Sequence, residues 1–173
     1  KQYLDKKDYK HVVNSLKKPL LSGGIFIEKF ENKISKFLKV KNVVACSSGT
    51  AALHMSFHSI NLCEGDAVVM PAINFISSYN IAKLFKAKIF LADVNPLSGQ
   101  MTPETLVECI KKNKLKKIKA IVTMYLGGNV IDLKKFYDLK KKYKAFLIED
   151  ACHAFGSKYK FNNKLLKIGS CYH

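Results

Sequence analysis

Short β-rich runs alternate with segments of helical pattern along most of this 173-residue chain. Five runs of four or five mostly apolar residues are candidate strands, at residues 42–46, 67–70, 88–92, 120–124 and 145–148. The segments between them have helical spacing or helix-start residues, at residues 47–57, 77–85, 102–104 and 133–144. Consecutive parallel strands need such long connections, which are usually helices. The alternation therefore predicts an α/β fold with a mainly parallel sheet.

Two further helices are expected before the first of these connections. They cover residues 5–16 and 25–37, and a Gly-containing break at residues 20–24 separates them. No internal repeat, low-complexity linker or domain boundary is visible, and 48% of the residues are hydrophobic. A chain of this length and composition is expected to form one domain with one core.

The net charge of +17 raises the question of a nucleic-acid-binding protein. All 30 basic residues are lysine, whereas base readout and bidentate phosphate contacts depend strongly on arginine. The lysines also cluster in two segments that a solvated helix face would expose, at residues 111–119 and 134–144. We therefore interpret the charge as a compositional bias and expect no nucleic-acid partner; the alternative is a non-catalytic module that binds polyanions.

The remaining composition points to the cytoplasm. No apolar run approaches the roughly 18 residues that a membrane span needs, and the basic, polar N-terminus does not resemble a signal peptide. The five cysteines are scattered without CxxC spacing, which indicates neither a zinc site nor a disulfide framework. We expect a cytoplasmic protein without a membrane partner or a bound metal.

Three loops at strand ends carry the chemical candidates, because ligands of open α/β sheets bind beside the carboxyl ends of strands. In the first, Ser48, Gly49 and Thr50 begin a helix. Small residues there let backbone N–H groups approach an anion, and the hydroxyls can assist. The same residues also fit an ordinary helix cap.

The second and third loops follow the runs 67–70 and 145–148. Phe75 stands where an aromatic ring can stack on a planar ligand, although a single Phe there is more often part of the core. Asp150 and His153 follow the last run, and a buried carboxylate there needs a cationic partner such as a protonated pyridine nitrogen. The alternative is an aspartate that caps the following turn.

An anion-binding helix start, an aromatic ring that can stack and a carboxylate that can pair with a ring nitrogen together form the set of groups that binds pyridoxal 5′-phosphate (PLP). The chain resembles the DegT/DnrJ/EryC1/StrS sugar aminotransferases, and the resemblance covers essentially its whole length. The motifs, in order, are LSGG at 21–24, SGTAAL at 48–53, EGDAVVMP at 64–71, DV at 93–94, KAIV at 119–122 and EDACHAFG at 149–156. This resemblance implies the aspartate-aminotransferase type I fold, with helices on both faces of the sheet, and makes residues 1–173 the N-terminal part of the PLP-binding large domain.

The resemblance also implies a role for each candidate. Ser48, Gly49 and Thr50 are expected to hold the cofactor phosphate, and Phe75 to stack on the pyridine ring. Asp150 is expected to pair with the ring nitrogen N1, and His153, where many relatives have Gln, to lie near the phenolic oxygen. Leu21 and Ser22 match a segment that contacts substrate in the family.

Within the family, the residues around 150–154 and 168–172 look like those of the transaminases of pseudaminic acid biosynthesis. This similarity implies a UDP-linked 4-keto-6-deoxy-N-acetylhexosamine as acceptor, glutamate as amino donor, and a homodimer for the full-length protein. Many other nucleotide-sugar 4-aminotransferases share most of these residues, so the sugar stays open.

The lysine that binds the cofactor covalently in relatives is expected shortly after His173, outside this sequence. Lysines at 158, 160, 164 and 167 lie in a polar hairpin pattern and are not assigned that role. We therefore expect no turnover by these residues alone and weak PLP binding at best. A histidine at the missing position would instead indicate a sugar 3-dehydratase of the same family.

Overall fold

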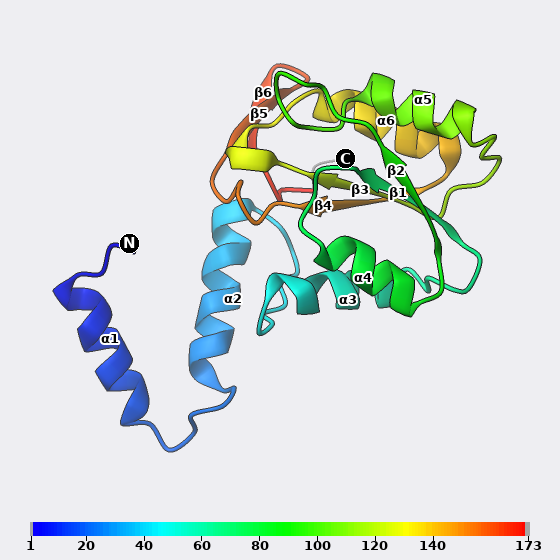
Figure 1. Ribbon diagram of the computed structural model, residues 1–173. Helices are drawn as coiled ribbons and strands as arrows, with labels where there is room; N and C mark the ends of the chain where they lie inside the picture. The colour runs from blue at the N-terminus through cyan, green and yellow to red at the C-terminus, as the bar shows by residue number, and fades with distance from the viewer. Residues whose placement is uncertain (1, 172–173) are drawn as a thin grey trace. The chain divides into compact units, whose positions relative to one another are not determined.

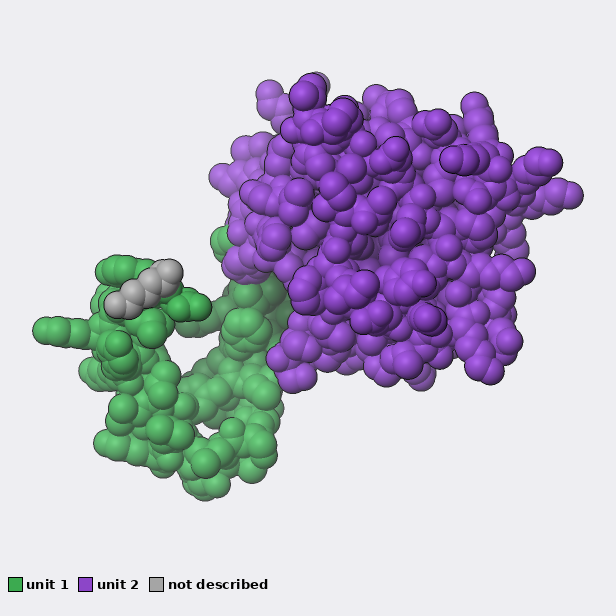
Figure 2. Space-filling view, in the orientation of Figure 1, with its two compact units in different colours: residues 1–45 green, residues 46–173 purple. Residues whose placement is uncertain are grey.

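A computed structural model describes residues 2–171, which form two compact units. The units comprise residues 1–45 and 46–173 (Figure 2). The sequence predicts no internal boundary, and neither a repeat nor a Pro-rich or Gly-rich linker marks the junction at residues 45 and 46. Contacts in space, rather than composition, reveal the division.

The first unit contains the two predicted helices, α1 (Lys6–Leu16) and α2 (Ile25–Leu38). Asp5 caps α1 by accepting hydrogen bonds from the backbone N–H groups of Lys7 and Asp8, and the Asp8 carboxylate accepts one from the Asp5 N–H. Neither helix has a fully buried residue. Within residues 2–171, no helix has the length and apolarity needed to cross a bilayer.

The prediction of a strand at residues 42–46 is wrong. This segment forms neither helix nor strand, and Val44 is 71% exposed. A β-prone run becomes a strand only when another strand pairs with its backbone, and here the N–H of Ala45 donates instead to Glu31 Oε1 (2.8 Å).

The second unit contains a parallel sheet and a hairpin (Figure 1). Its elements are α3 (Gly49–Ser59), β1 (Ala67–Pro71), α4 (Ser77–Leu84), β2 (Lys88–Ala92), α5 (Pro103–Lys112), β3 (Ala120–Met124), the 3₁₀ turn η1 (Leu126–Gly128), α6 (Leu133–Tyr143), β4 (Phe146–Asp150), β5 (Lys158–Phe161) and β6 (Lys164–Lys167). The sheet order is β2-β1-β3-β4, and every pairing in it is parallel. Four expected strands and the polar hairpin are thus confirmed.

Helices cover both faces of the sheet (Figure 1). Alternate residues of each central strand face opposite sides, so Val68 packs with α3 and α4 while Val69 packs with α5 and α6. Phe57 of α3 and Leu106 of α5 are completely buried in these two clusters. Burial on both faces explains why the strands are continuous apolar runs.

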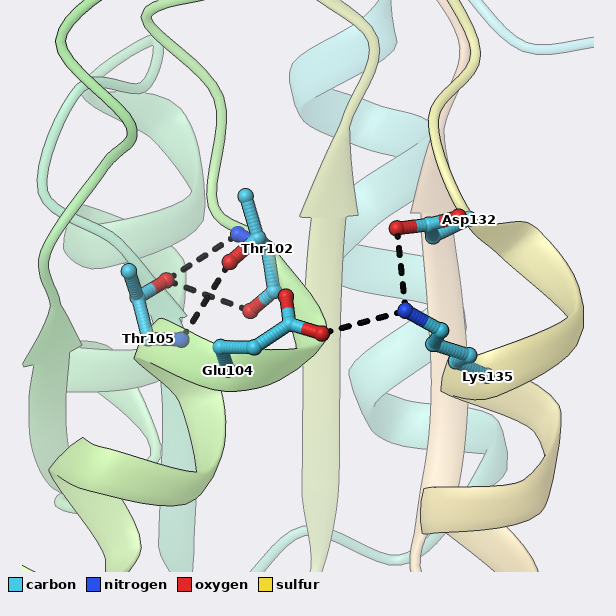
Figure 3. Close-up of polar contacts among 5 residues, drawn as sticks. All are labelled: Thr102, Glu104, Thr105, Asp132 and Lys135. Carbon is cyan, nitrogen blue, oxygen red and sulfur yellow. Dashed lines mark hydrogen bonds and ion pairs between the residues drawn. The ribbon is translucent and has the colours of Figure 1, made fainter.

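The start of α5 agrees with the sequence expectation. Thr102 is the N-cap, Pro103 is the first helical residue, and Thr102 and Thr105 each accept a hydrogen bond from the other's backbone N–H (Figure 3). Lys135 of α6 extends to Glu104 at 3.1 Å and to Asp132 at 3.5 Å. This exposed ion-pair group connects the first turns of α5 and α6.

Candidate functional site

The order of the strands determines where the site forms. The chain passes from β1 outward to β2 and then crosses back to place β3 on the other side of β1. Loops that leave β1 and β3 therefore diverge, and ligands of open α/β sheets bind at such switch points. A cavity of about 610 Å³ opens here. It is lined by Ser48, Gly49, Thr50, Leu53, Ile73, Asn74, Phe75, Ser77, Met124, Leu126, Asp150, Cys152 and His153.

The first turn of α3 forms one wall of the cavity. Ser48 is the N-cap, and its Oγ accepts a hydrogen bond from the N–H of Ala51 (3.1 Å). The alternative that this loop forms an ordinary helix cap is therefore correct for Ser48. Within residues 2–171 the N–H groups of Gly49 and Thr50 have no partner. Helix starts leave such N–H groups unpaired, and together with the helix dipole they favour an anion.

Two hydroxyls beside this turn add to the polar wall. Thr50 Oγ1 and Ser77 Oγ lie 2.7 Å apart, which joins the start of α3 to the start of α4. One of the two donates to the other, so one hydroxyl hydrogen stays available for a ligand. Ser77 was not predicted as a site residue, because a serine at a helix start is an ordinary cap residue.

Phe75 and Asn74 lie in the loop that follows β1. Phe75 is 63% exposed, so the alternative that it belongs to the core is wrong. Asn74 Nδ2 donates to Ser78 Oγ (3.2 Å), whereas its Oδ1 is buried without a partner in the described part of the chain. A buried amide oxygen with no partner in a ligand-sized cavity suggests that something else completes its hydrogen bonding.

Asp150 ends β4 and is only 8% exposed. Its Oδ1 accepts a hydrogen bond from the N–H of Cys152 (3.1 Å), so the carboxylate does cap the following turn. The residues described here place no lysine within ion-pair distance of it. A carboxylate this buried, on the wall of a cavity, is suited to a cationic group of a ligand.

Cys152 lies between Asp150 and the α3 turn. A hydrogen bond from its thiol to Asp150, helped by partial burial, raises the pKa of Cys152 to about 11. A side-chain carbon added to Gly49 would meet Cys152 Sγ at 3.1 Å, closer than such contacts normally are. The absence of a side chain at Gly49 thus keeps this corner of the cavity open.

His153 has one ring nitrogen bound to the protein. Its Nδ1 accepts a hydrogen bond from the backbone N–H of Gly127 (3.3 Å), in the turn after β3. His153 also lines the cavity.

Six of the eight predicted site residues therefore line one cavity. Leu21 and Ser22 belong to the first unit, where Leu21 is 70% exposed, and their expected role stays a prediction. Asn74, Ser77 and Cys152 also line the cavity but were given no role from sequence. Their only signal was their position in the loops 71–78 and 150–153.

A second hollow, of about 570 Å³, lies between α5 and α6. It is lined by helix residues, including Glu104, Lys135 and Leu139, and receives no strand end. The strand-end cavity is the stronger candidate, because it combines unpaired N–H groups with a buried carboxylate.

An open parallel sheet with a helix start suited to an anion and a buried acid at its switch point is typical of α/β proteins that bind a phosphorylated cofactor or nucleotide. The sequence model of the DegT/DnrJ/EryC1/StrS aminotransferase family matches residues 2–171. The chain belongs to this family.

The relatives agree with this assignment. GDP-perosamine synthase of Escherichia coli O157:H7 is 36% identical over 80% of this chain and 37% of its own length. UDP-4-amino-4,6-dideoxy-N-acetyl-beta-L-altrosamine transaminase of Campylobacter jejuni is 31% identical over 98% of this chain and 43% of its own. The structure of NtdA from Bacillus subtilis with bound cofactor PMP has a TM-score of 0.75 and 28% identity, and covers 86% of this chain and 34% of that protein. The chain thus spans about two fifths of the curated relatives it matches.

Proposed function

We propose that this chain is the cofactor-binding part of a PLP-dependent aminotransferase that acts on a nucleotide-linked 4-keto-6-deoxy sugar. The observation that carries the proposal is the cavity, in which the six residues assigned to PLP from sequence lie together. Membership of the aminotransferase family and the similarity to a PMP-bound structure support it.

The residues present fit PLP. The N–H groups of Gly49 and Thr50, with the Thr50 and Ser77 hydroxyls, suit a phosphate group. Asp150 suits a protonated pyridine nitrogen, because a buried carboxylate favours a cationic partner. Phe75 offers an exposed ring face within the same cavity.

Each side chain has one task in this proposal. Asp150 keeps a proton on N1 of the bound pyridine, the start of α3 anchors the phosphate, and Phe75 fixes the plane of the ring. PLP, when bound, supplies the electron sink that stabilises negative charge at the substrate carbon. Because Gly49 has no side chain, the corner of the cavity beside Cys152 stays open to the ligand.

No lysine lines the cavity among the residues that the structure describes. In the hairpin, Lys158 of β5 and Lys167 of β6 are opposite one another in the strand register and lie outside the cavity lining. Transamination needs a lysine at the cofactor to move protons, so we expect no turnover by these 173 residues alone.

The substrate is proposed from the relatives' names. Two of them make or use amino-deoxy sugars linked to GDP or UDP. We propose a UDP-linked 4-keto-6-deoxy-N-acetylhexosamine as acceptor and glutamate as donor, in surface polysaccharide or nonulosonic acid biosynthesis, with a homodimer as the full-length form.

Binding of 4-deoxypyridoxine 5′-phosphate to the chain tests the cofactor part. This probe has a methyl group in place of the aldehyde, so it does not react with the 30 lysines. Asp150→Asn keeps the side-chain shape but removes the charge, and we expect its affinity to fall about tenfold or more, the range of a charge-assisted hydrogen bond. Asp93→Asn, at the residue that follows β2 and outside the cavity lining, is the matched control. Equal affinity for wild type and Asp150→Asn would refute the proposed role of Asp150.

A further inference from the structure

We propose that the η1 turn is a positioning element that fixes His153 as a hydrogen-bond donor to the cavity, through its Nε2–H. The proposal concerns Gly127, Gly128 and Ser157, which have no part in the cofactor contacts above. Its ligand consequence rests on the proposed function, whereas the state of the imidazole does not.

The first step is the hydrogen bond at Nδ1. A backbone N–H can only donate, so Gly127 requires an unprotonated Nδ1 as acceptor (3.3 Å). In neutral imidazole the proton is then on Nε2. Since His153 lines the cavity, Nε2–H is the polar group that the ring can offer to a ligand.

The second step is the clamp between the turn and the loop after β4. Ser157 Oγ donates to the carbonyl oxygen of Gly128 (2.8 Å). A side-chain carbon on Gly128 would lie 2.7 Å from the carbonyl oxygen of His153, and φ of Gly128 is +79°. The two backbones therefore approach as closely as a glycine allows, which sets the position of Gly127 relative to the imidazole.

The third step is the anchor at the start of the turn. Tyr125 is 2% exposed, its hydroxyl donates to Glu149 Oε2 (2.7 Å), and its N–H donates to the carbonyl oxygen of Asp150 (3.3 Å). The turn is thus held at Tyr125 on one side and at Gly128 on the other. A turn fixed at both ends is a rigid support for the ring.

The consequence is a defined acceptor on the ligand. An Nε2–H donor suits an anionic or neutral oxygen, and in the proposed function this is the phenolic oxygen of the pyridine ring. Glutamine can place an amide N–H near the position of Nε2, whereas asparagine reaches only the position of Nδ1. His153→Gln and His153→Asn therefore separate the two ends of the imidazole.

Hydrogen exchange of the Gly127 amide tests, without any ligand, whether the hydrogen bond from Gly127 fixes the tautomer of His153. We expect His153→Ala to speed this exchange roughly three- to tenfold, the factor that an ordinary hydrogen bond supplies, and His153→Asn to restore much of the protection. Nitrogen NMR of the wild-type protein should show that Nδ1 of His153 is unprotonated and accepts a hydrogen bond, with the exposed His11 as internal reference. Unchanged Gly127 exchange in His153→Ala, or a protonated Nδ1 in neutral His153, would overturn the proposal.

Variants of the clamp test its cause. Gly128→Ala and Ser157→Ala should both move His153 toward the tautomer mixture of His11, the first more strongly because its added carbon has no room. Gly65→Ala is the matched control: its φ is +83°, but an added carbon meets nothing within 4 Å. Should Gly128→Ala not fold, Ser157→Ala still decides; an unaltered imidazole in that variant contradicts the clamp.

Two probes test whether the fixed tautomer of His153 contributes to ligand binding. We expect Ser157→Ala and His153→Asn to weaken 4-deoxypyridoxine 5′-phosphate at least threefold, but not its 3-O-methyl ether, which has lost the anionic phenolic oxygen; His153→Gln should retain the difference. If Asp150→Asn weakens both probes while the clamp variants do not separate them, the ligand consequence is wrong and the proposed function stands. If wild type binds neither probe, the proposed function fails. The Gly127 exchange alone then tests whether the turn fixes the tautomer of His153.

Discussion

Glu149 and Asp150 are consecutive acids at the end of β4, and strand geometry sends their side chains to opposite faces. Asp150 lines the cavity, whereas Glu149 accepts hydrogen bonds from the hydroxyls of Tyr125 (2.7 Å) and Tyr137 (3.0 Å). Burial raises the pKa of Glu149 above its ordinary value, although the two tyrosine hydroxyls oppose this effect. One acid is thus available to a ligand, and the other belongs to the internal packing.

The pKa of Glu149 makes stability depend on pH. Because its folded pKa is above its unfolded value, its protonated form stabilises the fold at low pH, and this contribution is lost as the pH rises through the folded pKa. We expect the free energy of unfolding of wild type, relative to Glu149→Gln, to fall as the pH rises above about 4.5. Denaturation over a pH series measures it, and a difference that does not change with pH would contradict the burial effect.

Gly49 is predicted to matter for binding rather than for stability. Gly49→Ala adds a carbon 3.1 Å from Cys152 Sγ, while alanine in a first helical turn costs nothing in propensity. We expect unchanged or slightly higher thermal stability, weaker binding of 4-deoxypyridoxine 5′-phosphate, and partial recovery of binding when Cys152→Ala is added. Full affinity in the single variant would show that the added carbon does not obstruct the cavity.

At the scale of elements, the α5 capping box allows a stability prediction. Thr102→Ala removes an N-cap side chain and is expected to lower the free energy of unfolding by about 1 kcal/mol. Lys135→Ala breaks two exposed ion pairs and should lower the free energy of unfolding by less than Thr102→Ala does (Figure 3). Added salt should diminish the Lys135→Ala effect. A larger effect from Lys135→Ala would reverse this order.

Elements that bury an apolar face could be predicted from sequence, and those that depend on a partner could not. The runs that became β1 and β3 are apolar on both faces because helices cover both, so sequence alone locates them. The run at 42–46 has similar residues, but its pairing depends on another segment, which local sequence does not encode.

At the scale of the molecule, the cavity joins residues from four separate stretches, near 48–53, 73–77, 124–126 and 150–153. The sequence predicted the residues that carry recognisable chemistry. It could not predict Cys152 against Gly49 or Gly127 against His153, because such contacts arise only when loops from different strands meet.

The two units are expected to differ in local stability. Neither α1 nor α2 has a fully buried residue, whereas β1 and β3 have several with no exposed surface. Local opening costs little where few apolar contacts are lost. Hydrogen exchange followed by peptide mass spectrometry should therefore show fast exchange over residues 6–38 and slow exchange over β1 and β3. Equal protection in both would contradict this difference.

The central claim is that the strand-end cavity of this chain binds the phosphorylated pyridine of PLP. NMR chemical-shift mapping with 4-deoxypyridoxine 5′-phosphate tests it most directly. The account predicts shifts concentrated at residues 48–50, 73–77 and 150–153, which largely disappear in Asp150→Asn. Shifts that instead follow the lysine-rich segments 111–119 and 134–144, and that persist in Asp150→Asn, would mean general anion binding and contradict the claim.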